Sequence, residues 1–132
     1  MSVLVDSSVW IAYFRGSDSG QALDTLLEEN LVVTNDLILT ELEPALRMRR
    51  QRKLINLLRV IRRPPISVDW DDLIRMQVTC LRNGIYKIGV PDLIIAQHAI
   101  HNGLQLMSLD RHFSRMARHL PLTLLPMYPH VA

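Results

Sequence analysis

The chain has 132 residues, of which 48% are hydrophobic and 21% are charged, with a formal net charge of +2. This length suits one domain with a real hydrophobic core, and the composition excludes an intrinsically disordered chain. The longest apolar runs are a few residues long, far below the roughly 20 residues that a membrane-spanning helix needs. With a single cysteine and no basic stretch before an apolar segment at the N-terminus, we expect one domain over residues 1–132 that works in the cytoplasm, away from membranes.

The first quarter of the chain alternates short apolar runs with amphipathic segments. This pattern predicts strands over residues 3–5 and 31–33 and helices over residues 7–14 and 17–29. The first strand ends on Asp6, and a carboxylate at the mouth of a buried strand is costly unless a cation meets it. Asp6 therefore either caps the next helix or belongs to a site.

The middle of the chain carries a capping-box pattern followed by a basic segment. The run from Thr40 to Glu43 predicts a helix with Thr40 as its N-cap and Pro44 near the end of its first turn. An amphipathic helix follows from Arg52. Eight of the 15 Lys and Arg residues lie in residues 47–63, and no acid does. Such a segment suits a polyanion, although a solvated helix face would have the same composition.

The second half of the chain continues the alternation. Predicted strands cover residues 66–68, 104–107 and 122–125, and predicted helices cover residues 70–81, 91–101 and 110–118. Short apolar strands alternating with helices predict a three-layer α/β/α fold, with a central parallel sheet of four to five short strands flanked by helices. In the helix over residues 70–81, we expect these side chains to face the core: Trp70, Leu73, Ile74, Val78 and Leu81.

Four carboxylates lie at the ends of predicted elements. Asp6 and Asp110 follow strands, Glu41 begins a helix, and Asp92 lies in the first turn of another. Each alone is explained by capping or by the helix dipole. If they converge, each pair about 4 Å apart repels by roughly 4 kcal/mol, so a cation is needed to keep them ionised. All-oxygen ligands favour Mg²⁺ or Mn²⁺ over zinc, and such a site beside a basic helix predicts hydrolysis of a phosphodiester.

The segments that carry these acids are VDSSVW, TELEPALR, PDLIIAQHA and LMSLDRHF. They resemble the four motifs of PIN-domain ribonucleases, and the length and spacing are similar to those of VapC-type toxins of toxin–antitoxin systems. The resemblance covers Val3 to about Leu125. It implies a PIN fold and a Mg²⁺- or Mn²⁺-dependent endoribonuclease that cleaves tRNA or rRNA. It also implies a homodimer and a cognate antitoxin that neutralises the toxin.

The resemblance also implies roles for individual residues. Asp6, Asp92 and Asp110 would hold the metal, with Glu41 completing the acidic site directly or through water, and with Glu43 as a competitor for that role. The motifs place two supporting hydroxyls beside these acids, from Ser8 and Ser108. For contacts with RNA phosphates, we expect the basic segment and the last helix to supply Arg47, Arg49, Arg50, Arg52 and Arg111.

Other functions remain open from the sequence. A non-catalytic RNA-binding or regulatory module would keep the fold and lose turnover. A phosphatase with an aspartyl nucleophile also begins with a strand and an Asp, but it usually carries a second Asp where this chain has Ser8. His98 and His101 share a helix face, and without Cys or a third His nearby we expect them at the rim of the acidic site, not on zinc. We expect His112 to cap the last helix or to support the site.

Overall fold

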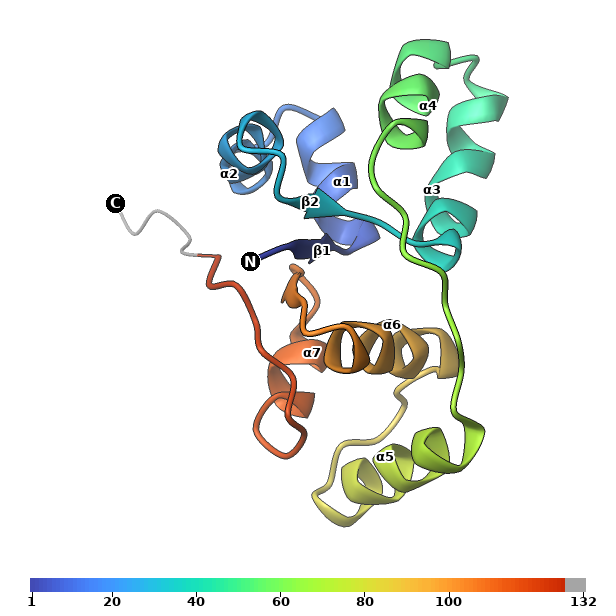
Figure 1. Cartoon of the computed structure of the whole chain (residues 1–132), viewed down its shortest axis with the longest axis vertical. Helices are drawn as coiled ribbons and strands as arrows, with labels where there is room; N and C mark the ends of the chain where they lie inside the picture. The colour runs from blue at the N-terminus through green and yellow to red at the C-terminus, as the bar shows by residue number, and fades with distance from the viewer. Residues whose placement is uncertain (128–132) are drawn as a thin grey trace.

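The computed structural model describes residues 1–127. In that range, three strands form a small parallel sheet, and seven helices surround it (Figure 1). Within the same range, no helix is both long enough and apolar enough to cross a membrane. The elements in chain order are β1 (Val3–Val5), α1 (Ser7–Phe14), α2 (Asp18–Glu28), β2 (Val32–Val33), α3 (Asp36–Met48), α4 (Arg52–Arg59), α5 (Trp70–Arg82), α6 (Val90–His101), β3 (Gln105–Met107) and α7 (Arg111–Met116).

The sheet has the strand order β2-β1-β3, with β1 in the centre and all neighbours parallel. All three residues of β1 are buried, as expected for a strand that helices cover on both faces. Helices α1 and α2 lie on one side of the strands, and α6 and α7 lie on the other (Figure 1). The direction of the connections reverses between β1 and β3. In open α/β sheets, ligands bind outside the carboxyl ends of strands at such a switch point.

The sheet has fewer strands than the sequence predicted. The segment over residues 66–68 forms no strand, and the chain before it touches β2 through a single parallel bridge between Val33 and Arg62. Pairing stops there because Pro64 and Pro65 have no N–H to donate to a ladder. The segment over residues 122–125 is likewise reduced to one parallel bridge, to β3, between two flanking prolines.

Helix α3 begins earlier than the capping-box pattern predicted. Its N-cap is Asn35, whose Oδ1 accepts a hydrogen bond from the backbone N–H of Ile38 at 2.8 Å. Thr40 is therefore inside the helix, where its hydroxyl donates to the carbonyl of Asp36 at 2.6 Å. The prediction of Thr40 as N-cap was wrong because a short apolar run before it reads equally well as strand or helix. Pro44 lies in the helix interior and cannot donate to the Thr40 carbonyl.

Helix α5 buries a different face from the predicted one. Leu73 faces the core as expected, together with Met76 and Cys80. Both apolar faces of α5 have helical spacing. Which face is buried depends on the position of α6, and the spacing of apolar residues in α5 carries no information about that position. The four remaining apolar residues form an exposed stripe, named the α5 stripe below: Trp70, Ile74, Val78 and Leu81.

The side chain of Gln97 on α6 fixes the start of α5. Its Oε1 accepts from the backbone N–H of Asp69 at 3.1 Å, and its Nε2 donates to the Asp69 carbonyl at 2.9 Å and to Asp72 Oδ2 at 2.9 Å.

Near the N-terminus, α2 packs closely on α1 because Gly20 has no side chain. A Cβ there would overlap the backbone of Tyr13.

Candidate active site

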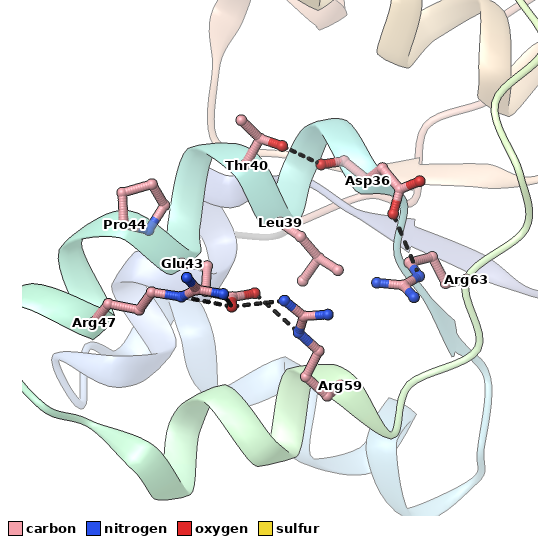
Figure 2. A pocket seen from close by; sticks show the side chains of 8 residues that line it. All are labelled: Asp36, Leu39, Thr40, Glu43, Pro44, Arg47, Arg59 and Arg63. Carbon is pink, nitrogen blue, oxygen red and sulfur yellow. Dashed lines mark hydrogen bonds and ion pairs between the residues drawn. The ribbon is translucent and has the colours of Figure 1, made fainter.

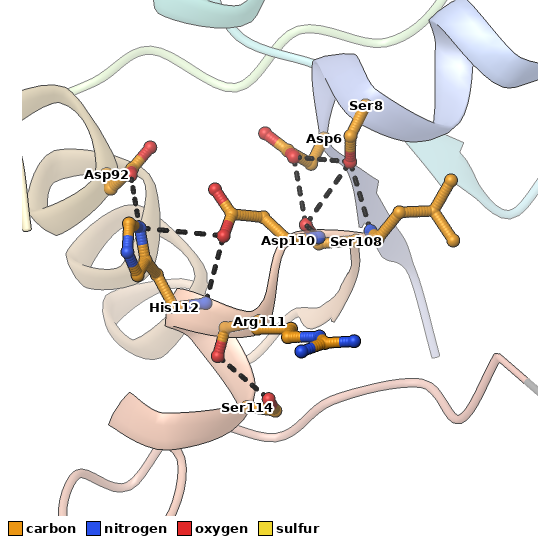
Figure 3. Close-up of polar contacts among 9 residues, drawn as sticks. Asp6, Ser8, Asp92, Ser108, Asp110, Arg111, His112 and Ser114 are labelled. Atoms are coloured by element: carbon orange, nitrogen blue, oxygen red, sulfur yellow. Dashed lines mark hydrogen bonds and ion pairs between the residues drawn. The ribbon is translucent and has the colours of Figure 1, made fainter.

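The carboxyl ends of β1 and β3 place Asp6 and Asp110 at one edge of the sheet (Figure 3). These two strands pair in parallel, Val5 opposite Met107, so the residues that follow them leave the sheet side by side. Asp6 is 5% exposed and lies at the N-cap position of α1, but its side chain makes no capping hydrogen bond. Capping therefore does not explain Asp6, and its carboxylate faces the edge where ligands of α/β sheets bind.

Two serine hydroxyls hold the carboxylate of Asp6. Ser8 Oγ and Ser108 Oγ both donate to Asp6 Oδ2, at 2.8 and 2.9 Å. Each hydroxyl also accepts a backbone N–H at 3.0 Å, Ser8 from Leu109 and Ser108 from Asp110. Since both hydroxyls bind Oδ2, the carboxylate is fixed in orientation and Oδ1 is left for another partner.

Asp92 and Glu41 reach the same region from α6 and α3. Burial raises the pKa of Asp92, and the negative charges of Asp110 and Asp6 raise it further, while His112 opposes the shift. Partial burial also raises the pKa of Glu41, and Asp6 and Asp92 add to it, while the Ser7 hydroxyl opposes it. Carboxylates shift one another in this way only at short range. The structure thus brings together the four acids that the motifs singled out.

His112 lies against two of these acids (Figure 3). Its Nδ1 is 3.5 Å from Asp110 Oδ1 and 3.8 Å from Asp92 Oδ2. The side chain of Asp110 accepts a hydrogen bond from the backbone N–H of His112 at 2.9 Å, which makes Asp110 the N-cap of α7. The sequence signal for this placement was the spacing of two residues after a strand-end Asp, which turns the ring back toward the sheet edge.

The donor set fits a divalent cation. Asp92, Asp110 and His112 each offer one atom, and the three atoms lie within 4.8 Å of one another. The Nδ1 of His112 is buried and has no hydrogen-bond partner within residues 1–127. Two clustered carboxylates, with the pKa of Asp92 raised, and a buried nitrogen without a hydrogen bond are the condition that a bound cation relieves.

Glu43 does not belong to this site, although it is two residues from Glu41. Residues two apart on a helix face nearly opposite sides, so Glu43 lies on the other side of α3 from Glu41. There it is buried between two guanidiniums (Figure 2). Arg47 Nη2 and Arg59 Nη2 both lie 2.7 Å from Glu43 Oε1. These arginines hold the pKa of Glu43 below its ordinary value, Arg59 more than Arg47. A cavity of about 480 Å³ adjoins this cluster.

The arginines predicted to contact RNA fall in four places. Arg47 is paired with Glu43, as described above. Arg49 lines a groove together with Glu41, and Arg50 and Arg52 lie at the turn between α3 and α4. Arg111 begins α7 and lines a cavity with Ser108 and Asp110. Two of these places, those of Arg49 and Arg111, border the acidic residues.

His98 and His101 do not lie at the rim of the acidic site. His98 is 4% exposed, and its Nδ1 accepts a hydrogen bond from Asn35 Nδ2 at 3.0 Å, which joins α6 to the start of α3. Burial lowers the pKa of His98, opposed by the carbonyls of Pro65 and Pro64. His101 Nε2 lies 3.2 Å from Asp72 Oδ2 on the α5 side of α6. Both histidines are therefore structural.

Known proteins share this architecture. The sequence profile described as PIN domain matches residues 3–119, and the chain belongs to the PIN-domain family, which confirms the resemblance seen in its four motifs. A search of curated protein sequences finds no significant match.

Solved structures of toxin–antitoxin proteins have the same fold. VapBC2 from Rickettsia felis, bound to a DNA fragment from its promoter, matches with a TM-score of 0.74 at 22% identity, covering 95% of this chain and 98% of that chain. FitAcB from Neisseria gonorrhoeae matches with a TM-score of 0.69 at 17% identity, covering 96% and 99%. VapC20 from Mycobacterium tuberculosis, described as a sarcin-ricin loop cleaving toxin, matches with a TM-score of 0.60 at 20% identity, covering 92% and 99%.

Proposed function

We propose that the chain is the toxin of a type II toxin–antitoxin system and an endoribonuclease that uses Mg²⁺ or Mn²⁺ to cleave tRNA or rRNA in the cytoplasm. The observation that carries this proposal is the convergence of four carboxylates at the edge formed by β1 and β3, at the switch point of the sheet. Membership of the PIN-domain family and the toxin–antitoxin structures that share the fold support it.

In this proposal, Asp6, Asp92 and Asp110 hold the metal. When bound, the ion supplies a water of lowered pKa and stabilises the charge that develops on the phosphate. Ser8 and Ser108 both donate to Asp6 Oδ2, which would leave Oδ1 as the ligand atom. Glu41 completes the site directly or through water. Burial and the negative charges of Asp6 and Asp92 raise its pKa, and a cation bound beside it would favour its ionised form.

The substrate is proposed to lie across the acidic edge, with basic side chains on its phosphates. In this arrangement, Arg49 beside Glu41 and Arg111 beside Asp110 contact phosphates of the RNA near the cleaved bond. Arg50 and Arg52 extend this contact along the turn between α3 and α4. Arg47 keeps the weakest role in our proposal, because Glu43 already neutralises part of its charge.

A groove beside the site supports the antitoxin as a partner. It has a volume of about 320 Å³ and lies between α1, α3 and α4. Its lining is mostly apolar, while Glu41, Arg15 and Arg49 supply charge. An amphipathic helix of the antitoxin would bury its apolar face here and cover Glu41, which would block access to the acids.

The α5 stripe supports a homodimer. Trp70 and Ile74 are each 61% exposed, and Val78 and Leu81 extend the same apolar surface along the helix. A contiguous exposed apolar surface with an aromatic residue is typical of protein–protein interfaces. A second copy of the chain is the proposed partner at this surface.

Incubation of the purified chain with total RNA in Mn²⁺ or Mg²⁺ tests the catalytic proposal. Wild type should give discrete fragments, EDTA should abolish them, and Asp92→Ala should give none. Asp71→Ala, which removes an exposed acid from α5, is the matched control and should cleave like wild type. Equal cleavage by Asp92→Ala would contradict the proposal. Absence of both cleavage and Mn²⁺ binding would favour the non-catalytic module, whereas Mn²⁺ binding without cleavage would mean that the RNA pool lacks the substrate.

A further inference from the structure

We infer that His112 is a ligand of the metal ion, and that its nitrogen makes the site select divalent transition-metal ions such as Mn²⁺ over Mg²⁺. This inference rests on the proposed function, which gives the site its metal. It goes beyond that function because it adds a nitrogen to an otherwise all-oxygen donor set and names the ion that the site prefers.

The geometry of three side chains carries the first step. Nδ1 of His112 lies 3.5 Å from Asp110 Oδ1 and 3.8 Å from Asp92 Oδ2. Two ligands bound at right angles to one ion, at 2.0–2.1 Å each, are separated by about 3 Å. The observed separations exceed this value by less than about 1 Å, which rotation of the side chains supplies. The nitrogen is therefore within reach of an ion shared with the two carboxylates.

The bonding state of His112 Nδ1 carries the second step. The atom is buried, and no group within residues 1–127 forms a hydrogen bond with it. Distances of 3.5 and 3.8 Å are too long for hydrogen bonds to the two carboxylates. The nitrogen is within ion-pair distance of both carboxylates and is hydrogen-bonded to neither. An ion between the three groups would satisfy all of them.

The backbone explains why the ring is held in this place. The N–H of His112 donates to Asp110 Oδ1 at 2.9 Å, so the ring and the carboxylate are fixed to the same helix start. The next residue, Phe113, is 1% exposed and anchors α7 in the core. Asp110 and His112 thus form one rigid unit, opposite Asp92 on α6. Such preorganisation is what a metal site requires.

The chemistry of the donor set gives the selectivity. Mg²⁺ is a hard ion that prefers oxygen ligands and gives up its waters reluctantly. Affinity for a site with a nitrogen ligand rises along the first-row divalent metals, from Mn²⁺ onward, and imidazole is a common ligand among them. Replacing one oxygen position with His112 therefore disfavours Mg²⁺ more than Mn²⁺.

Titration calorimetry with MnCl₂ and with MgCl₂ tests the selectivity. Wild type should bind Mn²⁺ at least about tenfold more tightly than Mg²⁺, and His112→Ala should weaken Mn²⁺ at least about tenfold, because even supporting residues of metal sites change affinity by 10–100-fold. Mg²⁺ affinity should change little. His119→Ala, an exposed histidine just beyond α7, is the matched control and should leave both affinities unchanged.

Pulsed electron paramagnetic resonance on the Mn²⁺-loaded full chain detects a nitrogen ligand directly. The wild-type spectrum alone gives this result, without a measurement of activity and even if a variant fails to fold. Wild type and His119→Ala should show ¹⁴N coupling to Mn²⁺, and His112→Ala should lose it. Bound Mn²⁺ without nitrogen coupling, and with affinity unchanged in His112→Ala, would overturn the inference and leave the proposed function standing. No Mn²⁺ binding in any form would overturn both.

Discussion

The acidic site and the Glu43 cluster lie on opposite sides of α3 and neutralise their carboxylates in opposite ways. Glu43 is enclosed by two guanidiniums, which lower its pKa. Glu41 and Asp92 face other carboxylates, which raise theirs. The first region carries its own cations and is complete as folded. In the second, hydroxyls, backbone N–H groups and the ring of His112 contact the carboxylates, and in our proposal a bound cation completes their neutralisation.

The largest expected effect separates the two glutamates by activity. Glu41→Gln should lower the RNA cleavage rate by at least about 100-fold, because it removes a charge from the proposed metal site. Glu43→Gln is the matched control on the same helix and should cleave at close to the wild-type rate. Cleavage rates measured on one defined RNA at saturating Mn²⁺ decide the matter. Loss of activity in both variants would mean that the two regions are not independent.

A second experiment examines the hydroxyls that orient Asp6. Ser108→Ala removes one of the two donors to Asp6 Oδ2, so the carboxylate loses its fixed orientation. The affinity for Mn²⁺ should fall by about tenfold. Ser114→Ala on the exposed side of α7 is the control, since its hydroxyl donates only to the carbonyl of Arg111 among residues 1–127. Calorimetry that gives equal affinities for the two variants would contradict the orienting role.

A third prediction concerns stability at the Glu43 cluster. Glu43→Gln should lower the free energy of unfolding at pH 7 by about 1–2 kcal/mol, at the low end for charged hydrogen bonds because the arginines are partly exposed. Since the folded-state pKa of Glu43 is lowered, its contribution is present above its ordinary pKa of 4.5 and is lost as pH falls through the folded-state value.

Urea denaturation of wild type and Glu43→Gln at pH 7 and at pH 3 measures this contribution. The difference between the two proteins should shrink at the lower pH. A difference that stays constant with pH would mean that packing, and not the charge of Glu43, causes it.

The smallest expected effect has the opposite sign and lies in the acidic site. The folded-state pKa of Asp92 is raised above its ordinary value of 3.8, so the metal-free chain loses stability as pH rises from that value through the raised pKa. Asp92→Asn removes this penalty, and its melting temperature without metal at neutral pH should exceed that of wild type by a few degrees.

Thermal melts with and without Mn²⁺ check the sign. Addition of Mn²⁺ should stabilise wild type and leave Asp92→Asn nearly unchanged, because ligand binding stabilises only the form that binds. Below pH 3.8 the two metal-free proteins should converge. A variant that is less stable than wild type at neutral pH without metal would show that the acids do not repel one another as described.

The sequence predicted the site best where acidic residues directly follow predicted strands. Asp6 and Asp110 follow strands whose apolar runs admit few alternatives, and parallel pairing of those strands brings the two acids together. The motifs also placed Ser8 and Ser108 correctly beside Asp6. These placements depend on local order along the chain and on the topology of a parallel sheet, both of which can be predicted from the pattern.

The failures come from contacts between distant segments. The N-cap of α3 is Asn35, and its neighbour His98 is far away in the sequence. The pairing of Glu43 with Arg59 also needs the position of α4, so the capping box was the simpler interpretation from local sequence. His112 was given a minor role because its approach to Asp92 depends on how α6 and α7 meet.

Helix α6 lies between the acidic site and the α5 stripe. Asp92 at its start faces the acids, while Gln97 and His101 bind Asp72 of α5 on its other side. Substitutions in the α5 stripe therefore do not touch the carboxylates of the acidic site. A partner that binds the α5 stripe, as proposed, can therefore differ without any change to the acidic residues.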